Sequence, residues 1–202
     1  MRITNTEVST GSLNINGTLT NNHNVTLENL NNGATGIEIG SNPLSTTGLL
    51  SMTNYGQSGL VVNGDQISST GGIHLTSNNS ITVNGTLVNN ETTTNNGLQI
   101  TNIVNDGTVN NSGILINGTV QTTAKADSQG NNVNKIVNHN TDAASAVNIA
   151  ETAQIISDGG IDIVSDGGQG VILDGTVLNA GNLGGNINIC LLYTSPSPRD
   201  RS

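Results

Sequence analysis

Aliphatic residues occur along almost the whole chain in short pairs, and a single residue separates the two members of each pair. Polar residues fill the interval before the next pair begins. Alternation with a period of two is typical of a strand that buries one face. The pattern predicts twelve short strands, at Leu13/Ile15, Val25/Leu27, Ile37/Ile39, Leu60/Val62, Ile73/Leu75, Ile81/Val83, Leu98/Ile100, Ile114/Ile116, Val147/Ile149, Ile161/Ile163, Val171/Leu173 and Ile187/Ile189.

The same pattern predicts almost no helix. No window keeps the i, i+3, i+4, i+7 spacing of an amphipathic helix for more than one turn, and the abundant Asn, Gly and Thr residues are poor helix formers. We therefore expect an all-β chain.

A ten-residue phrase recurs five times, each time as apolar residues, then Asn or Asp, then Gly-Thr and a further aliphatic residue. A repeated unit that cannot bury its own apolar face has to bury it against its neighbours, so the repeat predicts a stacked solenoid. The copies are LNINGTLTNN (13–22), ITVNGTLVNN (81–90), IVNDGTVNNS (103–112), ILINGTVQTT (114–123) and VILDGTVLNA (171–180).

The spacing of the repeat favours a parallel β-helix over an antiparallel meander. The glycines at 85, 107 and 118 are separated by 22 and then 11 residues, which predicts coils of about 21 residues with equivalent corners at half a turn. Asn-Gly between apolar residues is also a hairpin signal. However, only one or two apolar residues follow Gly-Thr before the next polar pair, which is too few for an ordinary return strand. We expect about nine coils over residues 1–189.

The glycine of the phrase is predicted to form a structural corner. Glycine would supply a positive φ there, the preceding Asn or Asp would bond its own backbone, and the aliphatic residue after Thr would re-enter the core. Stacked Asn side chains at the corners would form hydrogen-bonded columns. The predicted corner residues are Gly17, Gly85, Gly107, Gly118 and Gly175.

Two segments depart from the repeat. Residues 121–146 contain few apolar residues and both lysines, so we expect a loop that bulges from one coil. Residues 190–200, CLLYTSPSPRD, contain the only Cys and two of the three Pro. They resemble the translation of a sequencing adapter that contaminates metagenomic assemblies, which implies that Cys190 has no redox or metal role. We expect 190–202 to be a non-native or disordered tail; a natural Pro/Ser linker is the alternative.

Composition restricts the partners of the chain. Leu, Ile and Val make up 52 of 202 residues, but Phe and Trp are absent, which predicts a thin core of small aliphatic layers. The net charge is −9, with only two Lys and three Arg. We therefore expect no nucleic-acid partner and no binding to anionic membranes. No apolar run approaches the length of a spanning helix, so no direct membrane insertion is expected. The N-terminus lacks the apolar core of a signal peptide, so an export signal would lie outside this sequence.

The phrases GTVNNSGILI (107–116) and NAGNLGGNINI (179–189) resemble the passenger repeats of filamentous-haemagglutinin-type exoproteins and autotransporter adhesins. The general character of these repeats is similar over residues 1–189. It implies a right-handed parallel β-helix that is secreted through an outer-membrane translocator and acts outside the bacterial cell. The family's N-terminal secretion domain is not recognisable, because Asn42-Pro43-Leu44 matches its Asn-Pro-Asn motif only in part and is better explained as a turn. A C-terminal translocator barrel with aromatic-ended strands is not recognisable either. The resemblance therefore implies an internal fragment of a larger adhesin.

Acidic residues offer one candidate metal site. The tandem SDGGIDIV (157–164) and SDGGQGVI (165–172) brings together Asp158, Asp162 and Asp166 and is similar to calcium-binding nonapeptide repeats. Its spacing is eight rather than nine, and Val171 stands where that motif needs Asp. Corner turns with solvated carboxylates are therefore favoured, and we expect no metal and no cofactor.

Other chemistry is weaker in the sequence. The histidines at 23, 74 and 139 lie apart from Cys and grouped carboxylates, and His74 is predicted to point outward between Ile73 and Leu75. Single Thr residues after each corner glycine do not form the Thr-x-Thr ranks of ice-binding surfaces. Seven Asn-x-Ser/Thr sequons are as many as chance predicts for this composition. They begin at Asn16, Asn24, Asn78, Asn84, Asn90, Asn110 and Asn117.

These observations together predict a non-enzymatic adhesin segment at the bacterial cell surface, built as a structural shaft for cell adhesion. Its partners would be glycans or proteins of host or neighbouring cells, together with the outer-membrane translocator during secretion. The alternative is a fragment of a β-helical carbohydrate-active enzyme, a polysaccharide lyase or hydrolase. Such enzymes need grouped carboxylates or basic residues in a groove, and only the Asp residues from 158 to 174 could serve. We expect no catalytic residues.

Overall fold

The computed structural model describes residues 1–6, 11–93, 96–103, 113–181 and 184–191. Within them the chain forms 22 strands in three sheets. Sheet A contains β1 (Arg2–Asn5), β4 (Val25–Asn29), β7 (Leu50–Asn54), β10 (Ile73–Ser77), β13 (Leu98–Asn102), β16 (Lys135–Asn138), β19 (Ile161–Ser165) and β22 (Ile187–Leu191). Sheet B contains β2 (Leu13–Ile15), β5 (Ile37–Ile39), β8 (Leu60–Val62), β11 (Ile81–Val83), β14 (Ile114–Ile116), β17 (Ala146–Ile149) and β20 (Gly170–Leu173). Sheet C contains β3 (Leu19–Asn21), β6 (Leu44–Thr46), β9 (Ile67–Ser69), β12 (Thr86–Asn89), β15 (Thr119–Thr122), β18 (Gln154–Ser157) and β21 (Thr176–Asn179).

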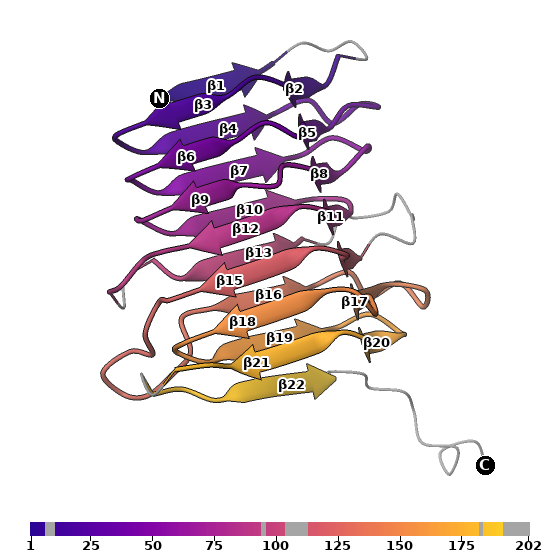
Figure 1. Cartoon of the computed structure of the whole chain (residues 1–202). Helices are drawn as coiled ribbons and strands as arrows, with labels where there is room; N and C mark the ends of the chain where they lie inside the picture. Colours follow the sequence, from indigo (N-terminus) through magenta and orange to yellow (C-terminus); the bar gives the residue numbers. More distant parts are fainter. Residues whose placement is uncertain (7–10, 94–95, 104–112, 182–183, 192–202) are drawn as a thin grey trace, which may run out of the picture.

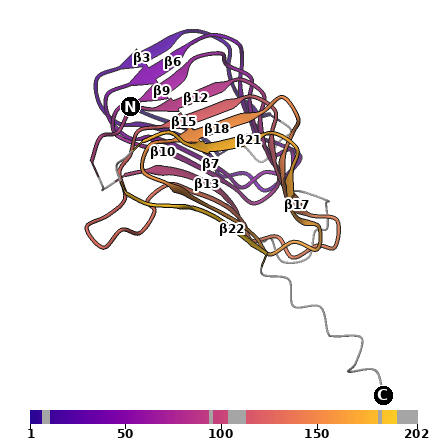
Figure 2. The same cartoon turned by 60° about the horizontal axis from the view of Figure 1, so that its bottom comes forward.

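The chain visits the three sheets in the order A, B, C and then starts the next coil, so each strand pairs in parallel with its equivalents one coil away. Figure 1 shows the coils stacked from the N-terminal to the C-terminal end. In Figure 2 the strands of the three sheets surround a common interior. The predicted all-β parallel β-helix is confirmed. The described residues contain no helix, so this part of the chain has no helix that could span a membrane.

The number and length of the coils differ from the prediction. Eight strands of sheet A define seven turns rather than nine. Regular turns are slightly longer than expected, since Ile73 pairs with Leu98, 25 residues later. One turn of sheet A is much longer, because the Gln99↔Lys135 pairing spans 36 residues. At about 4.8 Å per strand, seven steps give a length of roughly 34 Å for sheet A.

The spacing of the five phrases has a different cause from the one predicted. Ile81 pairs with Ile114 in sheet B, so a single coil of 33 residues separates the phrases at 81–90 and 114–123. The phrase at 103–112 falls between β13 and β14, within that coil, and residues 104–112 lie outside the described part. The 11-residue step is therefore an insertion in one coil and not half of a regular turn.

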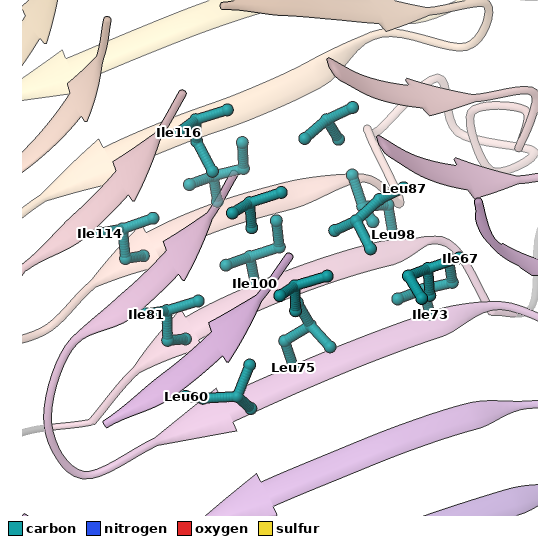
Figure 3. Packing of buried hydrophobic residues seen from close by; sticks show 14 of the residues in the cluster. Leu60, Ile67, Ile73, Leu75, Ile81, Leu87, Leu98, Ile100, Ile114 and Ile116 are labelled. Carbon is teal, nitrogen blue, oxygen red and sulfur yellow. The ribbon is translucent and has the colours of Figure 1, made fainter. Parts of the chain in front are cut away.

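The core consists of stacked aliphatic side chains. All twelve predicted pairs lie in strands of sheets A and B, and most are completely buried. Figure 3 shows Ile73, Leu75, Ile81 and Leu87 of one coil packed against their equivalents in neighbouring coils. Leu173 and Ile189 are each 42% exposed because they belong to the last strands of their sheets. Stacking therefore provides the burial that one coil lacks.

The strands of sheet C were not among the predicted pairs. In each of them one aliphatic side chain contributes to the core or packs against it. The next inward position holds a polar residue, for example Ser69 after Ile67 in β9. These strands follow the corner, as predicted for the aliphatic residue after Gly-Thr. A single apolar residue gives no alternation to detect.

Two segment boundaries need correction. Residues 121–146 are not one loop, because β16 lies inside this range and pairs with β13 and β19. Residues 123–134 form a projection between β15 and β16 (Figure 1), and 139–145 connect β16 to β17. At the C-terminal end, β22 continues through Cys190 and Leu191, two residues into the expected non-native tail. The remainder of that tail, 192–202, lies outside the described residues.

Candidate functional site

The predicted corner glycines lie between sheets B and C. Gly17, Gly85, Gly118 and Gly175 each follow the Asn or Asp after a sheet B strand, whereas Gly107 lies outside the described residues. The expected positive φ is wrong, because none of these four glycines adopts one. Glycine is needed at this corner because the backbones of neighbouring coils approach each other closely. A Cβ on Gly118 would lie 2.0 Å from the carbonyl oxygen of Gly85 in the preceding coil. Gly17 belongs to the first coil, and a Cβ there would meet no atom within 4 Å.

A buried polar column follows the last inward position of sheet A. Its side chains stack through the registered strands and are almost all fully buried. Asn54 donates from Nδ2 to Ser77 Oγ at 3.1 Å and accepts at Oδ1 from Asn29 Nδ2 at 2.8 Å. The predicted columns of hydrogen-bonded Asn are thus confirmed. The buried column comprises Asn5, Asn29, Asn54, Ser77, Asn102, Asn138 and Ser165.

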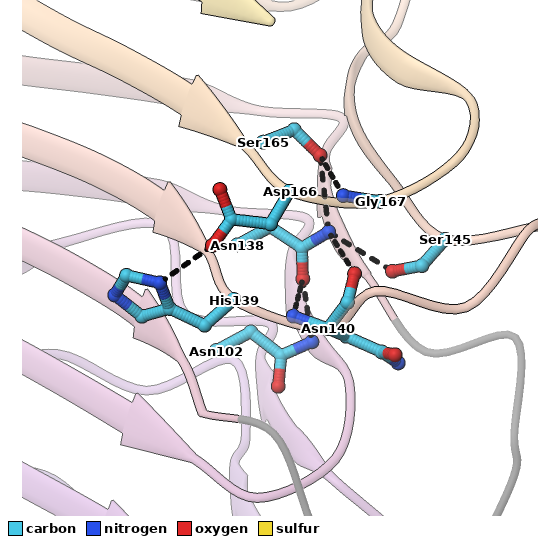
Figure 4. A network of polar contacts seen from close by, with 8 residues as sticks. All are labelled: Asn102, Asn138, His139, Asn140, Ser145, Ser165, Asp166 and Gly167. Atoms are coloured by element: carbon cyan, nitrogen blue, oxygen red, sulfur yellow. Dashed lines mark hydrogen bonds and ion pairs between the residues drawn. The ribbon is translucent and has the colours of Figure 1, made fainter. Parts of the chain in front are cut away.

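Figure 4 shows the buried column at its C-terminal half. Asn138 Oδ1 accepts from Asn102 Nδ2 at 3.0 Å, and Asn138 Nδ2 donates to Ser165 Oγ at 3.1 Å and to Ser145 Oγ at 2.9 Å. These bonds fix the turn from sheet A to sheet B. The Ser145 and Ser165 hydroxyls are buried and bonded to Asn138, so their arrangement suits a structural role better than nucleophilic chemistry.

An outer column of Asn stands at the corner between sheets B and C. Asn117 Nδ2 donates to Asn84 Oδ1, and Asn84 Nδ2 donates to Asn63 Oδ1, both at 2.8 Å. Asn84 and Asn117 begin two of the predicted sequons. These amides are exposed or partly exposed, so they present a regular polar edge to the solvent.

The three calcium candidates lie near one another in sequence but have separate partners. Asp162 points outward from β19 and accepts at Oδ1 from Asn132 Nδ2 at 2.7 Å and from Asn188 Nδ2 at 2.8 Å. Asp166 follows β19 and pairs with His139, with 2.9 Å between Oδ2 and Nδ1 (Figure 4). Asp158 lies in the corner between β18 and β19. Over the part of the chain that is described, no three His, Cys, Asp or Glu side chains are grouped to hold a metal ion.

One row of outward-facing polar side chains crosses sheet A and enters a groove. The row is formed by residues in register on successive strands, namely Thr26, Ser51, His74, Gln99, Lys135, Asp162 and Asn188. His74 points outward, as predicted. Burial lowers the pKa of the His74 imidazole below its usual range, and no described residue hydrogen-bonds its Nε2.

The projection 123–134 forms one wall of that groove. The groove has a cavity volume of about 500 Å³ and is lined by Gly97, Gln99, Asp127, Asn131, Asn132, Val133, Lys135 and Asp162. Hydrogen bonds from Asn131 hold the pKa of the Asp127 carboxyl below its usual range. We call this feature the sheet A groove. It combines amide, ammonium and carboxylate groups on the outer surface of the solenoid.

Asp162 was a candidate from the sequence, but the other residues that line the groove were not. Gln99, Lys135 and Asp162 are separated by 36 and 27 residues and meet only through the strand register. The departure of 121–146 from the repeat was the one available signal. Searches of protein-family models, of curated proteins and of solved structures each give no match to this chain.

Proposed function

We propose that this chain is a shaft segment of a non-enzymatic bacterial surface adhesin that acts outside the cell after passage through an outer-membrane translocator. One observation carries the proposal: three continuous parallel sheets place their outward-facing side chains in register at the constant spacing of the coils, and on sheet A these rows are largely polar. One such row on sheet A contains Thr53, Thr76 and Thr101. The resemblance to adhesin passenger repeats supports the same function.

The physical basis of adhesion would be repetition. A rigid stack presents hydroxyl and amide groups about 4.8 Å apart along each row, and each group can donate and accept hydrogen bonds. A single contact of this kind is weak in water. Many contacts made by one rigid surface gain by avidity, because the later contacts are intramolecular. Glycans and proteins on cell surfaces are suitable partners for such a surface.

The proposal is tested by coating beads with the full chain and measuring their retention on cultured epithelial cells and on bacterial lawns under flow. Beads with heat-denatured chain at equal density are the control. We expect retention at least several-fold above the control on one of these surfaces. Equal retention on all surfaces tested would contradict an adhesive function.

The sheet A groove favours one second candidate, a carbohydrate-active enzyme. Asp127 and Asp162 both line it, and paired carboxylates perform acid–base chemistry in glycoside hydrolysis. Incubating the chain with a polysaccharide panel and measuring new reducing ends distinguishes the two candidates. The adhesin proposal expects no products. Products that disappear in both Asp127→Asn and Asp162→Asn, but persist in Asp158→Asn, would establish the enzyme.

A further inference from the structure

We infer that the sheet A groove is a binding site for a neutral oligosaccharide. This inference rests on the proposed adhesive function and gives it a specific ligand class and place. The evidence is the rigidity of the groove wall, the free hydrogen-bonding capacity of its floor and the balance of its charges.

The wall is built into the fold at its base. Asn134 is buried and bonded on both sides: its Oδ1 accepts from Thr122 Oγ1 at 2.8 Å and from the Leu98 N–H at 3.0 Å. Its Nδ2 donates to the carbonyls of Ala124 and Gly160 at 3.1 and 3.0 Å. The projection is therefore tied to the coils before and after it.

Two further sets of bonds complete the wall. Asn132, only 7% exposed, donates to Asp162 Oδ1 and to the Asn186 carbonyl. At the tip, Asp127 Oδ1 accepts the N–H groups of Gln129 and Asn131 at 2.9 and 2.8 Å. A preformed wall lowers the entropy cost of binding a ligand.

The floor retains unused polar groups. Gln99, Lys135 and Asp162 are consecutive in register, about 4.8 Å apart from strand to strand. No described residue hydrogen-bonds the Gln99 amide or the Lys135 ammonium, and only Oδ1 of Asp162 is occupied by such bonds. The floor thus offers donors and acceptors in one row of roughly 10 Å, and sugar hydroxyls both donate and accept.

The charge and polarity of the lining select the ligand class. Two carboxylates and one ammonium leave the groove with a small negative charge, which disfavours phosphorylated, sulfated and uronic-acid ligands. Among the described residues of the lining, Val133 has the only apolar side chain, so a lipophilic ligand is also disfavoured. The volume of about 500 Å³ lies in the range of small-molecule sites. A short neutral sugar chain meets all these conditions.

Saturation-transfer NMR on the full chain with cellobiose, lactose and N,N′-diacetylchitobiose tests the inference, with polygalacturonate and heparin as charged comparators. We expect at least one neutral disaccharide to bind. Gln99→Ala and Lys135→Ala should each weaken binding about tenfold. The matched controls Lys125→Ala and Asp158→Asn should stay within twofold, because Lys125 and Asp158 do not line the groove.

Three results would overturn the inference: no signal with any neutral sugar, tighter binding of the charged comparators, or equal weakening by Lys125→Ala and Lys135→Ala. Circular dichroism of each variant shows that the β content is kept. The bead assay separates this inference from the adhesive function. If bead retention is unchanged in Lys135→Ala and no sugar binds, the groove is not the binding site but the adhesive function stands. If sugar binds but beads are not retained, the adhesive function is refuted and the groove remains a sugar-binding site.

Discussion

Asparagine has two different roles in this chain, and burial separates them. Water cannot reach the buried column, so its amides depend on hydrogen-bond partners within the protein. Loss of one side chain therefore leaves several polar groups without partners. In the outer column the same amides pair with each other beside solvent, which can replace a lost partner. The difference gives a direct comparison between Asn54 and Asn84.

Asn54→Ala should lower the free energy of unfolding by about 3 kcal/mol, because it removes the acceptor of the Gly56 N–H and one of the two acceptors of Asn29 Nδ2, which keeps only its bond to Thr35 Oγ1. Asn84→Ala should cost less than about 1 kcal/mol, since water can take the place of its amide. Urea denaturation followed by circular dichroism measures both. Equal losses would show that the column is not a principal source of stability.

Glycine is required at the corner between sheets B and C for space rather than for an unusual φ. Gly118→Ala would place a methyl group against the Gly85 carbonyl and should cost about 1–3 kcal/mol through overpacking. Gly17→Ala is the matched control, because nothing lies within 4 Å of its Cβ position. We expect its effect to stay within about 0.5 kcal/mol. Similar thermal midpoints for the two variants would contradict the account of the corner.

His74 should make stability depend on pH. Burial lowers its pKa below the ordinary value of 6.5, so the unfolded chain binds more protons than the folded chain just below that pH. The free energy of unfolding should therefore fall as the pH drops through this window. Denaturation at pH 7 and pH 5 should show a smaller fall for His74→Gln than for the wild type. The exposed His23→Gln should behave like the wild type; an unchanged fall in His74→Gln would refute the assignment.

At the scale of elements, each strand is stable only because of the coil above and the coil below it. Leu75→Ala in β10 removes a fully buried side chain from the middle of the stack and should cost about 2–5 kcal/mol. Leu178→Ala in β21 changes a side chain that is 48% exposed on the outer face, and we expect an effect within about 0.5 kcal/mol. Chemical denaturation of the two variants would detect the contrast, and equal costs would argue against a stacked core.

The sequence predicts these elements unevenly for a physical reason. Most strands of sheets A and B place two apolar residues inward, so Ile73/Leu75 or Ile81/Val83 produce a visible alternation; β1 and β16, with one inward aliphatic residue each, do not. A strand of sheet C buries one aliphatic residue and one polar residue, as Ile67 and Ser69 do, and this leaves no periodic signal. The sheet A groove was not predictable from the sequence. Gln99 and Lys135 are 36 residues apart because of an insertion, and only the strand register shows that they are neighbours.

At the scale of the whole molecule, both ends of the described solenoid expose unpaired strand edges. β1 and β22 are the outermost strands of sheet A, and core positions near the C-terminal end are partly exposed. Such edges are templates for pairing with another chain. The two ends are also complementary, since a parallel strand of one copy can continue the ladder of the next copy in a head-to-tail contact.

We therefore expect this chain to associate end to end as its concentration rises. Sedimentation velocity over a hundredfold range of concentration measures this association. Ile189→Lys, which places a charge at an inward edge position of β22, should reduce it several-fold. Asn188→Lys on the outward side of the same strand should not. A monodisperse monomer over the whole range would contradict the open-edge account.

We propose that this solenoid binds a neutral glycan without cleaving it. The most direct test immobilises the full chain, adds neutral polysaccharides and measures both the polysaccharide retained and the reducing ends released in the same sample. We expect retention that is weakened about tenfold by Lys135→Ala and is unchanged by Lys125→Ala, with no release above a blank surface. Release of new reducing ends that is lost in Asp162→Asn, or no retention of any polysaccharide, would contradict it.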